Sequence, residues 1–449
     1  MKTNTTRRRF LKAALAATVL PTVAVNSRAV HAAGSDVIKI ALIGTGGRGL
    51  GAVLNRFTVG DNVKLVAVAD VNEKRAREAV ESLKEDPKTK DRIDVPADRV
   101  FGGFNGYKGA VEHADLVFVA SPPAFHPDHY LYAVEHGKHV FVEKPFGVDA
   151  EGYRRSQKAN KIAEEKGLTV LSGFQRRHQK QYHDWFAKIN EGYIGDIVEA
   201  RVYWNGAGAK VRGVRDKGES EISFQVRDWY FFDWLSGDHL VEQHCHNVDV
   251  GNWLFGNGDP QVHPVSAIGL GGRQYRNIKH VPYNECGNIF DHHYIEFTYP
   301  DGRILHSQCR QIPGCWNRVT ERVTGTKGFG ETGWLQQRGG EKWNTPKLGK
   351  GGDNGYELEH AAQTDAIRNG KKLHEGWSAA TSTMVGILGT YASHSGREIT
   401  WDDAVSKGRT RFPYDVELTF DTPSPVLPQD GSYEHLVPVP GQWEPFDKT

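Results

Sequence analysis

Two segments of the chain carry side chains of the types that proton transfer requires. Lys144 lies between Glu143 and Pro145 after an apolar run, where a lysine can hydrogen-bond a substrate hydroxyl and favour its alkoxide. Glu242 precedes His246 by four residues, so on a helix the two side chains share one face. Because an imidazole titrates near neutral pH, His246 is a candidate general base. Together these residues predict the removal of a proton from a hydroxyl group.

Non-catalytic interpretations of the same residues also stay open. Asp249, three residues after His246, can orient the imidazole or balance its charge. His246 could instead be a helix histidine that is hydrogen-bonded in the core. Lys144 could be a surface lysine that closes a strand.

A metal ion is a further alternative, suggested by Glu242, His244, His246 and the run Asp291-His292-His293. His244 and His246 are two residues apart, so on a helix their side chains diverge, which weakens a shared metal. We therefore expect no metal.

A glycine-rich segment has the pattern that binds a dinucleotide. Residues 37–43 form an apolar, β-branched run typical of a buried parallel strand. GTGGRG follows, with Gly44, Gly46 and Gly49 in the GxGxxG spacing, and an apolar helix is expected over residues 50–57. Side chains at these glycines would keep the pyrophosphate from the backbone, and the helix amino terminus supplies N–H donors for that anion.

The next expected strand indicates which dinucleotide is bound. Residues 63–69 form a second apolar run, which ends in Asp70. The Asp70 carboxylate can accept hydrogen bonds from both ribose hydroxyls and would repel a 2′-phosphate, which favours NAD over NADP. Lys74 and Arg75 lie close enough to keep NADP open. The alternative is a tight glycine turn that binds no ligand.

Further strands continue the pattern. Strands expected over residues 114–120 and 139–142 enclose a helix over residues 127–136, an alternation typical of a doubly wound α/β sheet. Ligands of such sheets bind at the carboxyl ends of the strands. The residues expected to contact the cofactor are Gly44, Gly46, Gly47, Arg48, Gly49, Asp70, Ser121, Pro122, His126, Glu143 and Lys144.

These motifs resemble those of the Gfo/Idh/MocA family, which includes glucose-fructose oxidoreductase and inositol dehydrogenases. The matching segments are GTGGRG, the VAD strand end at Asp70, SPPAFH (121–126), GKHVFVEKP (137–145) and SGFQRR (172–177). Segments 237–256, 365–371 and 396–401 also match, so the resemblance covers residues 40–405.

One segment departs from the family pattern. Where the family has G-G-x-L-x-D-x-G-x-H-x-x-D, this chain has Glu242 in place of the Asp and His244 in place of the later Gly. The substrate and the reaction can therefore differ from those of the common dehydrogenases.

The resemblance implies an N-terminal Rossmann domain over residues 36–177 and an α+β domain over residues 178–412. The second domain is expected to hold a large, open, mostly antiparallel sheet that covers the nicotinamide and supports a homodimer or homotetramer. Its strands are expected at residues 197–204, 294–299, 303–309 and 319–325. Helices at residues 356–368 and 378–394 are expected to pack on the first domain. The proline-rich residues 413–449 are expected to form an extended arm on the chain's own surface or on a neighbouring subunit.

Aromatic and basic residues near the histidine segment could form the substrate site. Trp229 lies in the run RDWYFFDW (227–234), and aromatic faces stack on sugar C–H surfaces, although the run could equally fill the core. Arg176, Arg177 and His178 follow the last strand of the first domain. The candidate substrate contacts are Arg176, Arg177, His178, Trp229 and Asp249, and the candidate catalytic residues are Lys144, His246 and Glu242.

The first residues predict an export signal. TRRRFLK (6–12) matches the twin-arginine pattern S/T-R-R-x-F-L-K, and apolar residues 13–25 and a small-residue region follow. The apolar stretch is too short to span the roughly 30 Å of a bilayer core as a helix. We expect residues 1–33 to be a signal peptide that the twin-arginine machinery uses to export the folded protein to the periplasm. A plain N-terminal anchor and a chance basic cluster are the alternatives.

Composition limits the classes of partner. Lys plus Arg (56) nearly balance Asp plus Glu (55), so no strong field attracts nucleic acid or an anionic membrane. A length of 449 residues predicts two domains. The four cysteines are too few for a disulfide scaffold, although an exported protein could oxidise a pair such as Cys309 and Cys315.

Together these features predict an oxidoreductase with tightly bound NAD that transfers a hydride between the nicotinamide and a hydroxyl carbon of a sugar, polyol or glycoside. Tight binding suits the periplasm, which supplies little free NAD. One alternative is an NAD-dependent glycoside hydrolase, a reaction that some members of the family catalyse by transient oxidation, elimination, hydration and re-reduction. The other is a non-catalytic dinucleotide sensor, in which Lys144 and His246 would have no role.

Overall fold

Two β-sheets organise the part of the chain that the structure describes. The structure is a computed structural model and describes residues 37–209, 215–275, 287–349 and 352–447. The expected signal peptide lies outside these residues. Within them, no helix is both long and apolar enough to cross a membrane.

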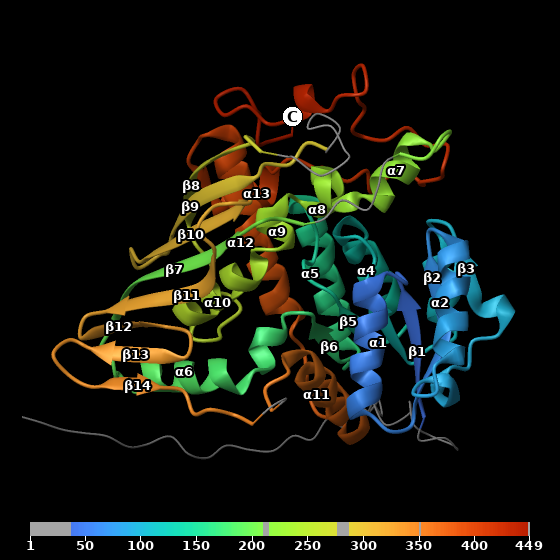
Figure 1. Ribbon diagram of the computed structural model, residues 1–449, viewed down its shortest axis with the longest axis horizontal. Coiled ribbons are helices and arrows are strands. Elements are labelled where there is room, and N and C mark those ends of the chain that lie inside the picture. Colours follow the sequence, from blue (N-terminus) through green and yellow to red (C-terminus); the bar gives the residue numbers. More distant parts are fainter. Residues whose placement is uncertain (1–36, 210–214, 276–286, 350–351, 448–449) are drawn as a thin grey trace, which may run out of the picture. The chain divides into compact units, whose positions relative to one another are not determined.

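The first sheet is parallel, with the strand order β3-β2-β1-β4-β5-β6 (Figure 1). Its strands are β1 (Ile38–Ile43), β2 (Val63–Asp70), β3 (Val100–Gly102), β4 (Leu116–Val119), β5 (His139–Val142) and β6 (Val170–Ser172). The strand order reverses between β1 and β4, and a crevice for a ligand forms at such a reversal.

Both faces of this sheet are buried, which explains its unbroken apolar strands. In β1, Ile40 and Leu42 pack in one apolar cluster, whereas Ala41 and Ile43 pack in another on the opposite face. The first cluster includes residues of α1 (Gly47–Val59) and α2 (Glu73–Glu85). The second includes residues of α3 (Gly106–Glu112), α4 (His126–Glu135) and α5 (Ala150–Glu165).

The second sheet has nine strands in the order β14-β13-β12-β11-β7-β10-β9-β8-β15. Its strands are β7 (Ile197–Gly206), β8 (Ser266–Gly272), β9 (His292–Thr298), β10 (Ile304–Gln311), β11 (Arg318–Gly325), β12 (Gly328–Glu331), β13 (Trp334–Gln337), β14 (Lys342–Asn344) and β15 (Ile399–Thr400). Only β7 and β10 pair in parallel; the other described pairs are antiparallel. The expected fold class, a Rossmann sheet plus a mostly antiparallel sheet, is therefore confirmed.

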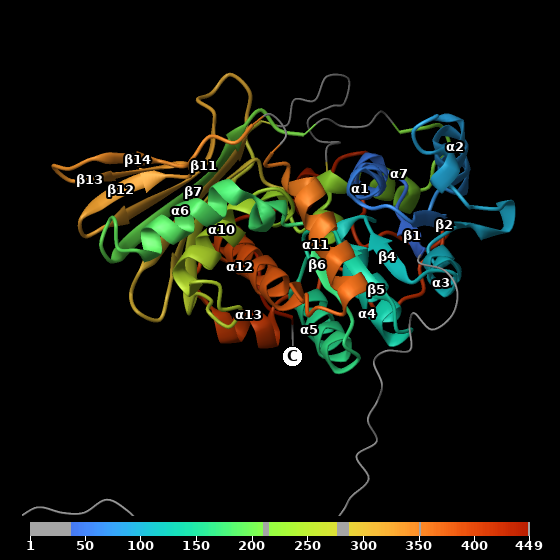
Figure 2. The ribbon, with the colours of Figure 1, turned by 90° about the horizontal axis from the view of Figure 1, so that it is seen from below.

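Helices cover one face of the second sheet (Figure 2). They are α6 (Lys180–Asn190), α10 (Cys245–Gly256) and α12 (Gly376–Ser395), and α13 (Trp401–Lys407) follows β15. Alternate residues of the strands point into this layer, as Ile295 and Phe297 of β9 do. Helix α11 (Gly355–Asn369) packs on the first sheet's side, where Arg56 of α1 donates to the His360 carbonyl over 2.8 Å.

A group of short helices joins the two sheets at the crevice. These are α7 (Glu221–Arg227), η5 (Trp229–Phe231), α8 (Asp233–Ser236) and α9 (His239–Glu242). The C-terminal arm packs against them within the same chain: Leu418 and Val426 share an apolar cluster with Phe224 of α7. The arm therefore lies on its own subunit, one of the two expected arrangements.

The described cysteines Cys245, Cys309 and Cys315 are free thiols. Cys309 is buried on β10 and Cys315 is exposed, so the pairing considered for these two is absent. Cys286 lies outside the described residues.

Candidate active site

A cavity of about 100 Å³ lies at the carboxyl ends of β1, β2 and β4. Of the residues expected to bind the cofactor, the following line it: Gly44, Gly46, Gly47, Arg48, Asp70, Ser121 and Pro122. The crevice predicted from the alternation of strands and helices is therefore a real cavity at the expected edge of the sheet.

The glycines of this loop serve two different purposes. A Cβ on Gly44 would lie 2.4 Å from the Ala120 carbonyl oxygen, and one on Gly49 would lie 2.1 Å from the Gly44 carbonyl oxygen. Close packing of β1, β4 and α1 therefore requires glycine at both positions. At Gly46 and Gly47, in contrast, a Cβ would meet no protein atom within 4 Å. The protein alone does not require glycine there, and the absence of side chains leaves room for a ligand to approach the backbone closely.

The amino terminus of α1 is open to an anion. The helix begins at Gly47, its N-cap Gly46 offers no side-chain hydrogen bond, and no acidic residue lies in its first turn. The first N–H groups of a helix lack partners inside the helix and carry a favourable dipole for a phosphate. These residues therefore fit a bound dinucleotide.

Asp70, at the end of β2, lies beside this anion site. Its carboxylate accepts hydrogen bonds from the Thr45 N–H and hydroxyl, each over 2.9 Å, and pairs with Arg75 over 2.7 Å. Arg75 also lines the cavity, whereas Lys74 pairs with Glu78 on the exposed side of α2. Of the two basic residues that kept NADP open, only Arg75 is near the cavity.

Lys144 contacts Glu242 twice. Its Nζ donates to the Glu242 carbonyl oxygen over 2.6 Å and to Oε1 over 2.8 Å. Burial alone would lower the pKa of Lys144, but the Glu242 carboxylate, with smaller contributions from Cys245 and Glu143, raises it above its ordinary value. Lys144 is therefore a cation at neutral pH, which can donate to a substrate oxygen but cannot act as the base.

His246, in contrast to the charged Lys144, has a lowered pKa. Burial, and then the positive charges of Lys144, Arg176 and Arg48, hold its pKa well below the ordinary histidine value. Its ring lies between Trp204 and Phe174, with centroids 6.0 and 5.9 Å away, and its Nδ1 has no hydrogen-bond partner among the described residues. The imidazole is therefore neutral at pH 7 and able to accept a proton.

The expected shared helical face of Glu242 and His246 is wrong. Helix α9 ends at Glu242 and α10 begins at Cys245, so Gln243 and His244 break the helix between them. His244 is buried, and its Nε2 bonds the Ser307 hydroxyl of β10 over 2.9 Å. Both Glu242 and His246 still have electrostatic contact with Lys144.

The expected pairing of Asp249 with His246 is also wrong. Asp249 accepts three hydrogen bonds from Arg177, the shortest over 2.7 Å, and another from the Ser382 hydroxyl over 2.7 Å. The carboxylate balances the charge of Arg177 rather than of the imidazole, and it joins α10 to α12.

The basic residues after β6 are all paired with carboxylates. They occupy the 3-10 helix η4 (Gln175–His178), in which Arg176 pairs with Glu321, Arg177 with Asp249 and His178 with Glu375. Arg176 also lies over the Trp204 ring, 5.7 Å from its centroid, and so borders His246. These pairs hold η4 against β11, α10 and the start of α12.

Two expected cofactor residues have other neighbours. His126 lies outside the cavity lining, and its ring nitrogens contact the carbonyl oxygens of Pro145 and Ser121 over 2.7 Å each, so it ties the two loops together. Burial lowers the pKa of His126 to about 4. Glu143 pairs with Arg48 over 2.6 Å and can thereby fix Arg48 at the cavity.

Trp229, a candidate substrate contact, lines the cavity of the glycine loop. Together with Val226 it lines the same space as Gly44 and Asp70, although both come from the segment that joins the two sheets. The sequence offered no sign of this, because α7 and η5 reach the cavity only through tertiary packing.

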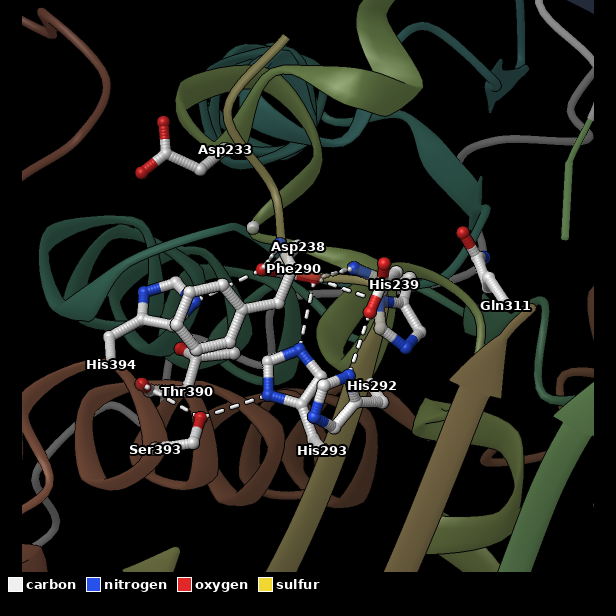
Figure 3. A network of polar contacts seen from close by, with 12 residues as sticks. Asp233, Asp238, His239, Phe290, His292, His293, Gln311, Thr390, Ser393 and His394 are labelled. Atoms are coloured by element: carbon white, nitrogen blue, oxygen red, sulfur yellow. Dashed lines mark hydrogen bonds and ion pairs between the residues drawn. The ribbon is translucent and has the colours of Figure 1, made fainter. Parts of the chain in front are cut away.

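Of the possible metal ligands considered from the sequence, His293 belongs to a buried group of such residues, whereas Glu242, His244 and His246 do not. Asp238, His293 and His394 place one ligand atom each within 4.8 Å of one another (Figure 3). The Arg411 guanidinium lies 3.5 Å from Nδ1 of His394, and it can only donate. Burial lowers the pKa of His394 to about 4, so the ring is neutral and carries its proton on Nε2, toward Asp238. This tautomer favours a hydrogen-bonded network over a metal site.

Comparisons with known proteins agree with a dinucleotide-binding role for this cavity. Residues 38–174 match the GFO_IDH_MocA family, described as an oxidoreductase family with an NAD-binding Rossmann fold. The chain is 24% identical to scyllo-inositol 2-dehydrogenase (NAD(+)) of Bacillus subtilis over 374 residues. This alignment covers 81% of this chain and 96% of the relative. It is 28% identical over 323 residues to glycosyl hydrolase family 109 protein 4 of Phocaeicola vulgatus, which covers 66% of this chain and 55% of the relative.

Solved structures show the same fold. Scyllo-inositol dehydrogenase from Lactobacillus casei, with bound NAD(H) and scyllo-inositol, superposes with a TM-score of 0.59 at 19% identity and covers 82% of this chain and 99% of that chain. Residues 38–174, which match the family model, include the whole parallel sheet described above.

Proposed function

We propose that this protein transfers a hydride between NAD and a hydroxyl carbon of a sugar, polyol or glycoside, so that the alcohol is oxidised to a carbonyl or the carbonyl is reduced to the alcohol. The observation that carries the proposal is Lys144, held by Glu242 over 2.6 and 2.8 Å, in electrostatic contact with His246, whose Nδ1 has no partner among the described residues. This environment raises the pKa of Lys144 and lowers that of His246, which favours a cationic lysine and a neutral imidazole. A hydride-transfer enzyme acting on an alcohol needs both a donor to the substrate oxygen and a base for its proton. The inositol dehydrogenase relatives support a polyol or sugar as the substrate class.

In the oxidation direction, Lys144 donates a hydrogen bond to the substrate hydroxyl oxygen and stabilises negative charge on it. His246 accepts the hydroxyl proton on its unprotonated nitrogen. Bound NAD supplies the acceptor for the hydride that leaves the same carbon as the carbonyl forms. Glu242 keeps Lys144 charged and in place through its two acceptor atoms.

The test is NADH formation, followed by absorbance, with a panel of inositols, aldoses and glycosides. Lys144→Met and His246→Ala should lose turnover but retain NADH binding, because neither side chain lines the glycine-loop cavity. Turnover close to that of the wild type in both variants would contradict the assigned roles and direct attention to His178 or His239.

We also propose that NAD is preferred over NADP and is held tightly. Asp70 supports the preference, because its carboxylate would repel a 2′-phosphate even with Arg75 beside it. Trp229 and Val226 support tight binding, because they close the cavity from outside the Rossmann domain.

The C-terminal arm braces this closing segment. The side-chain amide of Gln225 in α7 donates to the Val426 carbonyl over 2.6 Å and accepts from the Ser424 hydroxyl over 2.7 Å. At the other side of the cavity, Asn105 donates to Glu417 of the arm over 2.7 Å. Release of the dinucleotide past Trp229 would require these contacts to loosen, which favours slow dissociation.

A glycoside hydrolase with a redox-neutral cycle is the second candidate. The relative named glycosyl hydrolase family 109 protein 4 favours it, as do Glu242 and His244 at positions where the family pattern differs. Such an enzyme oxidises a ring carbon, eliminates the aglycone, adds water and then returns the hydride. Aryl glycosides would be cleaved with no net NADH, and in heavy water deuterium would enter the carbon next to the oxidised one. Cleavage without deuterium uptake would exclude this cycle.

A non-catalytic dinucleotide sensor is a weaker candidate. It would bind NAD but would need neither the charged Lys144 nor the neutral His246. Retention of NAD by a protein that neither oxidises nor cleaves any member of the panel would favour it.

We propose that the protein reaches the periplasm through the twin-arginine machinery. TRRRFLK and the short apolar stretch that follows support this route. Replacing both Arg7 and Arg8 with Lys should leave a folded, NAD-bound precursor in the cytoplasm. Normal export of that variant on cell fractionation would contradict the route and imply secretion as an unfolded chain.

We further propose a homodimer or homotetramer that forms through the second sheet. Ile268 and Leu270 alternate on β8 with 47% and 73% of their surface exposed, on the side away from the helices. Large exposed apolar side chains in a row favour a protein contact. Light scattering of the purified protein tests this, with Leu270→Lys as the variant expected to dissociate.

A further inference from the structure

Asp238 occupies a backbone conformation that suits glycine. It follows Gly237 in the turn between α8 and α9, with φ 77° and ψ 161°. A residue with a Cβ is strained there, and such strain persists where the surroundings impose it. Asp238 therefore points to a role for its side chain that glycine could not fill.

The Asp238 carboxylate is fully buried and accepts five hydrogen bonds (Figure 3). Oδ1 accepts from the His239 N–H, from His239 Nδ1 over 2.9 Å and from His293 Nε2 over 3.1 Å. Oδ2 accepts from the Phe290 N–H over 2.9 Å and from His394 Nε2 over 3.0 Å. Burial would raise the pKa of this carboxyl, but the imidazoles hold it well below its usual value.

These donors come from separate parts of the fold. His239 begins α9, His293 lies on β9, and His394 lies in the last turn of α12. The Ser393 hydroxyl contacts the other nitrogen of His293 over 2.9 Å, so α12 and β9 are joined twice. One carboxylate thus ties α9 to both neighbouring elements.

Helix α9 transmits this anchoring to the active site. It has four residues, with Asp238 as its N-cap and Glu242 as its last residue. A single turn has little stability of its own, so its direction depends on its cap and its packing. Glu242 offers both its carbonyl oxygen and its carboxylate to Lys144, and both contacts require α9 to keep this direction.

We propose that Asp238 is a positioning residue for Lys144: its carboxylate fixes α9 so that Glu242 holds the lysine from two atoms. The inference rests on the proposed function only for its consequence in turnover. The contact of Lys144 with Glu242 can be measured without any substrate.

The measured quantity is the pKa of Lys144, which depends on the titratable groups in electrostatic contact with it. They are Glu242, Cys245, Glu143, His126 and His246. The Asp238 carboxylate instead contacts His239, Phe290, His293 and His394, so we expect its effect on the pKa of Lys144 to pass through the position of α9.

The experiment is competitive acetylation of Lys144 by acetic anhydride across a pH series, read by mass spectrometry of the NAD-bound protein. In the wild type, the labelling pKa of Lys144 should lie above the ordinary lysine value. Glu242→Gln removes the negative charge beside Lys144, and the fall in labelling pKa that it causes is the reference for the other variants. Asp238→Asn and Asp238→Gly should lower the labelling pKa by about one unit, a tenfold change in reactivity at a given pH. The same variants should lower kcat more than they change KM.

The matched control is Asp430→Gly. Asp430 is exposed and also has a positive φ, 49°, so this change puts glycine at a second aspartate with positive φ that takes no part in the contacts of Lys144 and Asp238 described above. It should leave the labelling pKa and kcat of the wild type unchanged. A folded Asp238→Gly protein with a wild-type Lys144 pKa would overturn the proposal and leave Asp238 as a turn residue.

A second variant covers the case in which Asp238→Gly does not fold. His394→Asn removes one donor to the carboxylate and leaves the turn intact, and it should lower the Lys144 pKa in the same direction by a smaller amount. A wild-type labelling pKa in both His394→Asn and Asp238→Asn would equally overturn the proposal. If the wild type turns over no member of the panel while these pKa shifts are observed, only the proposed function is contradicted.

Discussion

Lys144 is held by Glu242 through two atoms of the same residue, a backbone carbonyl at 2.6 Å and a carboxylate oxygen at 2.8 Å. The carboxylate raises the pKa of the lysine, and the carbonyl fixes its direction without adding charge. One contact can therefore be removed by substitution while the other remains. The effect of Glu242 on the charge of Lys144 can thus be tested separately from its effect on the position of Lys144.

The first prediction uses that separation. Glu242→Gln keeps the backbone contact but removes the carboxylate that raises the pKa of Lys144. The pKa of the lysine should fall, so the loss of activity at high pH, where Lys144 deprotonates, should begin at lower pH than in the wild type. The pH dependence of kcat/KM checks this. An unchanged high-pH limb would mean that Lys144 does not act as the cationic donor.

The second prediction concerns the base. The pKa of His246 is depressed by burial and nearby cations, so the imidazole stays neutral as the pH falls from 7. The acid limb of kcat/KM should therefore lie well below the ordinary histidine value of about 6.5. His246→Ala should abolish that limb and lower kcat by about 10²–10⁴-fold, the usual contribution of a general base. An acid limb that survives in His246→Ala would belong to another group.

The third prediction concerns the choice of dinucleotide. Asp70→Ala removes the acceptor for the ribose hydroxyls and leaves Arg75 free to meet a phosphate. Preference for NAD over NADP should fall by roughly 1–3 kcal/mol, the cost of losing charged hydrogen bonds. Titration of the stripped protein with both dinucleotides measures it. Asp98→Ala, an exposed carboxylate in the same domain, is the matched control.

The fourth prediction concerns retention of the cofactor. Trp229→Ala should open the cavity and speed the dissociation of NADH, which a chase with excess NAD measures by the loss of bound NADH fluorescence. Trp316→Ala is the control, because Trp316 is 60% exposed and lies outside this cavity. Equal dissociation rates in the wild type and Trp229→Ala would show that Trp229 does not retain the dinucleotide.

The fifth prediction concerns acid stability. His126 has a pKa of about 4 in the folded protein, so the unfolded chain takes up its proton at a higher pH than the folded one. Stability should therefore fall as the pH drops through the window from about 6.5 to 4, by roughly 2 kcal/mol between pH 6.5 and 5 from this residue. His126→Gln should be less stable at pH 7 but should lose less on acidification. Urea unfolding at pH 7 and pH 5 measures both.

Much of the fold was predictable because its signals are local. The strand at residues 139–142 was predicted with the bounds that β5 has, since a short buried run of β-branched and aromatic residues has few alternatives. The strand expected at residues 197–204 continues to Gly206 because β10 and β11 pair along its whole length. The glycine loop was predictable for the same reason, since strand, loop and helix are contiguous.

The site was predictable only in part. Lys144 and His246 were identified from motifs, but the break between Glu242 and His246 was not, because Gln243 and His244 carry no helix-breaking residue type. The break follows from tertiary contacts, such as that of His244 with Ser307 on β10. Asp238 was missed for a related reason: its partners His293 and His394 are 55 and 156 positions away in sequence.

The bracing of α7 by the arm also sets an order of events during synthesis. Asp149, which caps α5, accepts hydrogen bonds from the N–H groups of Arg411 and Phe412, and Val426 accepts from Gln225. A ribosome makes these arm residues last, long after the glycine loop has emerged. The Rossmann sheet can therefore fold while translation continues, but the wall around Trp229 is completed only near the release of the chain. A truncated product would expose an open cavity, and this gives the cell a physical distinction between finished and unfinished molecules.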